Sequence, residues 1–204
     1  MPKAKPRTRR TQQERSDATQ LALLDATIAC MTRDGYAGTS ISTIVEEAGV
    51  SRGALLHHFP TKNELIAHAI YHFYAQRLAR FKKQLIGATT DKLSLEDRLR
   101  VLRDDFALWN DTALEIENTL RTNPDIAAIE ETLLAEKSEA MSVEYEQLFP
   151  EFLTTTRPRE LVGIACNLMR GLVNSEKDED AERRFEVCAA MLRAYLDSSE
   201  RKAG

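Results

Sequence analysis

The chain has 204 residues, of which 43% are hydrophobic, 6% aromatic and 29% charged, a composition typical of a soluble protein that can bury a core. No apolar run approaches the roughly 18 residues of a membrane span, and the basic N-terminus lacks the apolar stretch of a secretory signal. The three cysteines are odd in number and widely spaced, which favours small buried thiols in a reducing compartment. We therefore expect a cytoplasmic protein without a membrane partner.

The net charge of −4 hides a difference between the two ends of the chain. Residues 1–62 carry nine Lys/Arg and six Asp/Glu, a balance of +3, which leaves −7 for the remaining residues. A basic end on an acidic body suits a protein that approaches a polyanion, such as double-stranded DNA, with one face.

Apolar residues recur at three- and four-residue intervals nearly everywhere, and no segment alternates with the period of a strand. The fold class is therefore predicted to be all-α, with about nine helices and no sheet. Residues 1–16 are predicted to form a basic flexible arm. A first helix follows and stops at Gly35, and Thr39 or Ser40 caps a second. Further helices are predicted from Ser51 to Phe59, from Thr61 to about Leu85, and at 94–110, 112–122, 124–149, 158–174 and 180–198.

Residues 40–59 contain the small and capping residues that two short, steeply crossed helices require. Ala48 allows the helices to approach, and Gly49 permits a positive φ in the turn. Ser51 is placed to cap the next helix, whose N-terminal amides can then face a phosphate. The first turn of that helix, residues 52–54 (Arg-Gly-Ala), is small enough to bring the backbone and the arginine to base edges in the major groove.

The run Ala-Gly-Val-Ser-Arg-Gly-Ala-Leu-x-His-His-Phe-Pro-x-Lys from Ala48, preceded by Gly-Tyr-x-x-Thr-Ser, resembles the DNA-binding domain of the TetR family. The resemblance covers about residues 17–77, and implies an effector-binding and dimerisation domain over residues 78–204. Leu56 stands where the family often has a tyrosine that contacts a phosphate. The DNA-binding residues expected on this basis are Thr39, Ser40, Ser51, Arg52, Gly53, Ala54, His57, His58 and Lys62.

The basic N-terminal arm allows two interpretations. Its cations can neutralise phosphates or enter a minor groove, or they can belong to a solubilising tail. The spacing His68-x-x-x-His72 is one that zinc can use, but no cysteine or carboxylate completes a ligand set, so we expect no metal and no cofactor. The cations of the arm are Lys3, Lys5, Arg7, Arg9 and Arg10.

In the family that this chain resembles, the middle helices of the C-terminal domain enclose a small-molecule pocket. Aromatic, methionine and a few polar side chains suit such a cavity. Core packing nevertheless explains each apolar member more readily, and a satisfied hydrogen bond or an exposed face explains each polar one more readily. The candidate effector residues are Arg103, Phe106, Trp109, Met141, Tyr145, Asn167 and Arg170.

The last two predicted helices carry apolar stripes and small residues that permit close helix approach. The resemblance implies that this pair meets its twin in a four-helix bundle of a homodimer, whereas an intramolecular core is the alternative.

The function predicted from the sequence is a ligand-responsive repressor that binds a pseudo-palindromic operator as a dimer. The alternative is a DNA-binding regulator whose C-terminal domain docks a protein partner and has no small-molecule effector. An enzyme is not expected, because the sequence has no Gly-rich phosphate loop, no Gly-x-Ser-x-Gly elbow and no metal quartet.

Overall fold

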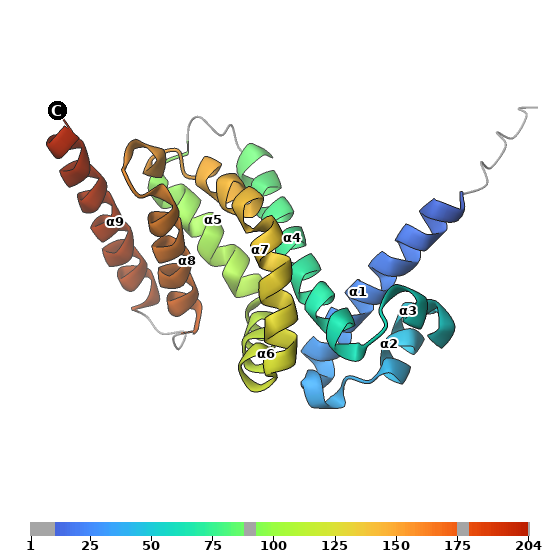
Figure 1. Ribbon diagram of the computed structural model, residues 1–204. Helices are drawn as coiled ribbons and strands as arrows, with labels where there is room; N and C mark the ends of the chain where they lie inside the picture. Colours follow the sequence, from blue (N-terminus) through green and yellow to red (C-terminus); the bar gives the residue numbers. More distant parts are fainter. Residues whose placement is uncertain (1–10, 88–92, 175–179, 204) are drawn as a thin grey trace, which may run out of the picture.

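A computed structural model describes residues 11–87, 93–174 and 180–203, and in these ranges every regular element is helical (Figure 1). This confirms the all-α fold class. The elements are α1 (Gln12–Gly38), α2 (Ile41–Ala48), α3 (Arg52–His58), α4 (Lys62–Gly87), α5 (Leu95–Leu108), α6 (Asn110–Thr122), α7 (Pro124–Gln147), the 3₁₀ helix η2 (Phe152–Thr154), α8 (Pro158–Asn174) and α9 (Ala181–Ala203).

The helices are arranged along one direction, from α1–α3 at one end to α8 and α9 at the other (Figure 1). We call α1, α2 and α3 the head, and α5 to α9 the body. Helix α4 begins beside α3 and runs from the head into the body, where it packs against α7 and α5. The head is therefore joined to the body by a continuous helix.

Three hydrophobic clusters follow one another along the molecule. The head cluster packs Leu23, Ile44 and Leu55 together, all without exposed surface. A junction cluster combines side chains of α1 and α4 with others of α6 and α7. A body cluster holds α4, α5, α8 and α9 together. Burying each large apolar side chain contributes about 1.5–3 kcal/mol to the free energy of folding. The junction cluster therefore stabilises the packing of the head against the body. Its fully or nearly fully buried members are Met31, Ile66, Ala67, Ile70, Phe73, Ile116 and Ile126.

Helix α1 begins earlier than the sequence analysis placed it. Thr11 Oγ1 accepts a hydrogen bond from the Glu14 amide at 3.1 Å, and the Glu14 carboxylate accepts one from the Thr11 amide at 2.7 Å. This reciprocal capping box starts the helix at Gln12, so residues 12–16 are helical and do not belong to an arm. The basic residues of the predicted arm lie outside the described residues.

Other boundaries follow the local signals in the sequence, with small differences. Gly35 has a φ of +67° and interrupts the helical path as predicted, but one more turn follows, to Gly38. The capping box predicted at Thr61 is confirmed, because the Glu64 amide donates to Thr61 Oγ1 at 3.1 Å and the Thr61 amide to the Glu64 carboxylate at 3.0 Å. Pro124 occupies the first turn of α7, also as predicted. The 3₁₀ helix η2 was not predicted.

Candidate nucleic-acid interface and interdomain groove

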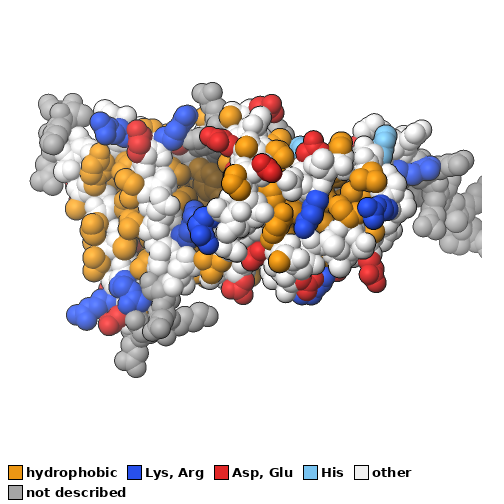
Figure 2. Space-filling model, turned by 60° about the horizontal axis from the view of Figure 1, so that its bottom comes forward, with side chains coloured by type: hydrophobic (Ala, Val, Ile, Leu, Met, Phe, Trp, Pro, Cys, Tyr) orange, Lys and Arg blue, Asp and Glu red, His pale blue; other side chains and the backbone are white. Residues whose placement is uncertain are grey.

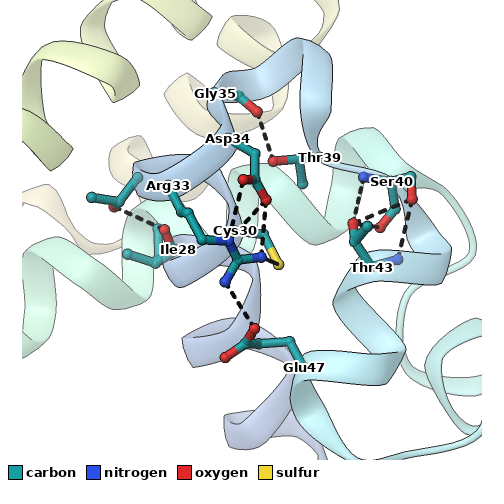
Figure 3. Close-up of polar contacts among 10 residues, drawn as sticks. Ile28, Cys30, Arg33, Asp34, Gly35, Thr39, Ser40, Thr43 and Glu47 are labelled. Carbon is teal, nitrogen blue, oxygen red and sulfur yellow. Dashed lines mark hydrogen bonds and ion pairs between the residues drawn. The ribbon is translucent and has the colours of Figure 1, made fainter.

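The turn between α2 and α3 has the geometry that its sequence predicts. Ser40 caps α2, because its hydroxyl accepts the Thr43 amide at 3.1 Å while the Thr43 hydroxyl accepts the Ser40 amide at 2.9 Å (Figure 3). Gly49 ends α2 in the left-handed conformation, with φ 65° and ψ 32°. Only glycine adopts this conformation without steric cost, so the glycine lets the chain turn within three residues and start α3.

The helix-turn-helix is fixed to α1 by an arginine network as well as by its core. The Arg33 guanidinium lies 2.9 Å from the Glu47 carboxylate on α2 and 2.9 Å from the Asp34 carboxylate on α1 (Figure 3). All three side chains are largely exposed, so each pair contributes little, at most about 1 kcal/mol. The pairs orient α2 on α1, and the buried head cluster supplies most of the stability.

Helix α3 presents its first turn outward. The Ser51 hydroxyl accepts the Ala54 amide at 3.1 Å and so caps the helix, as predicted. Arg52, Gly53 and His57 are exposed, and Arg52 has no ion-pair partner among the residues that the structure describes. A side chain at position 53 would meet only Ser51 Oγ, at 3.9 Å. A small, uncovered helical turn with a free guanidinium matches what the major groove of DNA admits.

The predicted DNA-binding residues do not all lie on this exposed surface. Thr39 is only 1% exposed, and its hydroxyl donates to the Gly35 carbonyl at 2.8 Å, so it closes the end of α1 and does not face outward. Lys62 Nζ donates to the Tyr36 carbonyl at 3.5 Å and lies 4.4 Å from the centre of the Tyr36 ring. Burial lowers the pKa of Lys62. His58 is half-buried, with its ring 5.4 Å from that of His57.

The predicted effector residues are divided between the core and the surface of the body. Phe106 is buried in the body cluster, and Tyr145 packs against it, its ring 6.2 Å from that of Phe81. Arg103 lies at the surface, 2.9 Å from the Glu182 carboxylate. These three residues therefore take part in core packing and an ion pair. The sequence could not show this, because a core face and a cavity wall have the same residue spacing on a helix.

The remaining effector candidates also lie at different places and do not line one cavity together. Asn167 is exposed, and Arg170 forms an ion pair with Glu117. The side chain of Met141 lies outside the described residues. Trp109, the last candidate, caps the junction of α5 and α6 and lines a groove.

This groove lies between α1 of the head and α4 and α6 at the head–body junction. Its volume is about 760 Å³, which is within the usual range for small-molecule sites of about 300–1,000 Å³. Sequence analysis missed all of its members except Trp109, because they come from helices that are far apart in the chain. The lining residues are Asp25, Ile28, Ala29, Thr32, Arg33, His72, Phe73, Gln76, Arg77, Ala79, Arg80, Trp109 and Thr112.

Comparison with known proteins bears on the head and on the whole chain. Residues 23–69 match the family described as bacterial regulatory proteins, tetR family. An HTH-type transcriptional regulator of Mycobacterium tuberculosis is 30% identical over 195 residues, which cover 92% of this chain and 99% of that protein. The chain belongs to the TetR family. It is therefore a DNA-binding helix-turn-helix transcriptional regulator, and the family is not one of enzymes.

Two further proteins resemble the chain over most of its length. The HTH-type transcriptional regulator CymR of Pseudomonas putida is 32% identical over 184 residues, 87% of this chain and 89% of CymR. The crystal structure of the multidrug-binding protein EbrR, complexed with imidazole, superposes with a TM-score of 0.60 at 20% identity, over 85% of this chain and 93% of EbrR. The second likeness supports the fold alone.

The described ranges contain neither a membrane-spanning helix nor a cluster of metal ligands. None of the helices there combines the length and the apolarity that a membrane crossing requires. No three His, Cys, Asp or Glu side chains of the described residues come together as metal ligands. His72 instead contacts Asp25 of α1, with Nε2 2.9 Å from the carboxylate, and His68 packs against the Phe59 ring at 5.5 Å.

Proposed function

We propose that the chain is a ligand-responsive repressor that binds a pseudo-palindromic operator as a homodimer. The observation that carries the proposal is the exposed first turn of α3, where Arg52 has no ion-pair partner among the described residues and the helix N-terminus is capped. Residues 17–77 then form the DNA-binding domain, and residues 78–204 the effector and dimerisation domain, with α4 shared between them. Repression needs no contact beyond the operator, because a dimer bound over a promoter excludes polymerase.

The proposed dimer uses the face formed by α8 and α9, where hydrophobic side chains gather in rows (Figure 2). A groove of about 410 Å³ between the two helices can receive side chains of a second copy. Met191 on α9 is 63% exposed, which is unusual for a large apolar residue in a row of others. Pairing this face with its copy would bury both rows and set two heads for two half-sites. The exposed apolar residues of the face are Ile164, Val187, Met191 and Tyr195.

A responsive site is supported by the groove beside Trp109. A C-terminal domain that only docked a protein partner would need no cavity near this residue. The groove has the size of a small-molecule site, and most of its exposed lining surface is apolar although eight of its thirteen side chains are polar or charged.

Selection of bound sequences from random duplex DNA tests the proposal. The purified protein should retain a two-fold-symmetric site, and Arg52→Ala should lose or relax its preference at the base pair that the guanidinium reads, at a cost of about 1–3 kcal/mol. Arg121→Gln is the matched control, because Arg121 is an exposed arginine on α6, outside the head. Failure to enrich any sequence, at low as well as physiological salt, would contradict the proposed function.

A further inference from the structure

The groove between α1, α4 and α6 is bridged by hydrogen bonds between side chains. On one side, the Asp25 carboxylate of α1 lies 2.9 Å from His72 Nε2 and 3.2 Å from Gln76 Nε2, both on α4. On the other, the hydroxyls of Thr32 on α1 and Thr112 on α6 lie 2.9 Å apart. These contacts are exposed or half-buried, so water competes for them, and each contributes only about 0.5–1.5 kcal/mol.

The groove has an aromatic wall. The rings of Phe73 and Trp109 meet edge to face, with centroids 5.8 Å apart, and Ile28 and Ala29 line the opposite side from α1. The indole Nε1 is buried and has no hydrogen-bond partner among the described residues. Ring contacts, and no hydrogen bond of the indole to a described residue, therefore hold Trp109 in the wall of the groove.

Most of the charged side chains that line the groove have a partner within the protein. Two of its three arginines are neutralised within the protein, Arg33 by Asp34 and Glu47, and Arg77 by Asp105 at 2.8 Å. The Asp25 carboxylate is hydrogen-bonded to His72 and Gln76. Arg80 differs from the other two.

The guanidinium of Arg80 lies 5.7 Å from the centre of the Trp109 ring, and the structure gives it no carboxylate partner within the described ranges. A guanidinium presents several donors to one anionic group and stacks on an aromatic face at the same time. An unpaired cation at the edge of an apolar groove favours a molecule that carries one negative charge on an apolar body.

We propose that this groove is the effector site and that it binds a small organic anion with a flat apolar body. The anionic group pairs with Arg80, and the body packs against Phe73 and Trp109. The inference rests on the proposed function for its effect on DNA, but the binding site itself stands on the groove alone.

The position of the groove couples binding to the head. Helix α1 supplies Leu24 and Cys30 to the head cluster, and Ile28 lines the groove and also packs against that cluster. A molecule seated between α1 and α4 replaces the side-chain bridges across the groove and turns α1, and α2 and α3 turn with it. The two heads of a dimer then no longer match the two half-sites, so the ligand weakens operator binding. Couplings of this kind are typically 5–150-fold.

The first experiment measures binding of a probe without DNA. Anilinonaphthalene sulfonate is a flat apolar anion, and phenylnaphthylamine is its neutral counterpart. Trp109 is the only tryptophan of the chain, so a probe bound in the groove quenches its emission. We expect the sulfonate to quench Trp109 emission with saturation, and Arg80→Gln to raise its Kd at least about tenfold, as loss of a charged contact predicts, while the Kd of the neutral probe stays within about twofold.

Two further variants make the result decisive. Arg121→Gln, an exposed arginine outside the groove, should leave the Kd of both probes unchanged. Ala29→Phe places a ring in the groove and should block both probes, and helical circular dichroism checks that each variant is folded. The proposal is overturned if the sulfonate leaves Trp109 emission unchanged, or if Arg80→Gln binds it as the unmodified protein does. Binding at the apolar α8–α9 face would give both of these results.

A second experiment separates this inference from the proposed function. Operator binding is titrated with and without the sulfonate, with Arg80→Gln in parallel. If no sequence-specific DNA binding exists, the proposed function fails, whatever the probe does. If the operator binds but the sulfonate weakens binding equally in both proteins, or in neither, the assignment of the effector site fails alone.

Discussion

The ion pair between Arg77 and Asp105 is buried inside the molecule and gives the sharpest stability prediction. The Arg77 guanidinium on α4 donates two hydrogen bonds to one Asp105 oxygen on α5, at 2.8 and 3.2 Å. The side chains are only 6% and 3% exposed. Asp105→Leu would leave the guanidinium in the interior, between the rings of Phe73 and Phe106, with no counter-charge.

The expected loss follows from the cost of an unpaired buried charge. Removing one partner of such a pair lowers the free energy of unfolding by about 3–5 kcal/mol. For a chain of this length, each kcal/mol changes the Tm by about 2–4 °C, so Asp105→Leu should lower the Tm by roughly 6–20 °C. The double variant Arg77→Met/Asp105→Leu removes both charges and fills the space with apolar atoms. It should regain most of the loss, or exceed the original stability.

Thermal denaturation at a fixed protein concentration measures these differences. Glu96→Gln is the control, because Glu96 and Arg193 form an equally short ion pair that is about 40% exposed, and its loss should cost at most about 1 kcal/mol. A Tm of Asp105→Leu equal to that of Glu96→Gln would refute the argument. So would a double variant that is less stable than the single one.

Three further predictions concern other parts of the chain. Gly49→Ala forces an L side chain into the left-handed region and should lower the free energy of unfolding by about 1–2 kcal/mol. Gly53→Ala lies inside α3 and should not lower the free energy of unfolding. Thermal denaturation compares the two variants. Met191→Glu should convert dimer to monomer in sedimentation velocity and weaken operator binding, and an unchanged sedimentation coefficient would exclude the α8–α9 interface. Burial raises the pKa of Glu130, so its carboxylate destabilises the fold above its ordinary pKa of about 4.5. Glu130→Gln should therefore raise the Tm at pH 7 but not at pH 4.

Local features of the fold could be predicted from the sequence because their causes are local. The left-handed turn at Gly49, the cap at Ser51 and the capping box at Thr61 each depend on residues within four positions. The exposed recognition turn follows from them. The same reasoning applied to Thr11 and Glu14 would have found the start of α1, but the basic residues that precede them concealed the capping signal.

The groove could not be predicted, because its walls depend on how distant helices pack. Asp25 and His72 are 47 positions apart and meet only because α1 lies along α4. Aromatic spacing on a helix is the same for a core and for a cavity wall, so Phe106 and Trp109 looked equivalent in the sequence although one is core and the other lines the groove. The available signal was the set of polar residues, His72, Gln76 and Arg80, spaced four apart on one face of α4.

The junction cluster determines what can be exchanged between relatives of this protein. Ile116 of α6 and Ile126 of α7 pack directly against the α1 and α4 side chains that support the reading head. A chimera that grafts residues 1–77 of this protein onto the body of another regulator would set these aliphatic side chains against a surface that did not evolve with them. New DNA specificity is therefore more safely transferred by replacing the outward residues of α3 alone, because none of them belongs to this cluster.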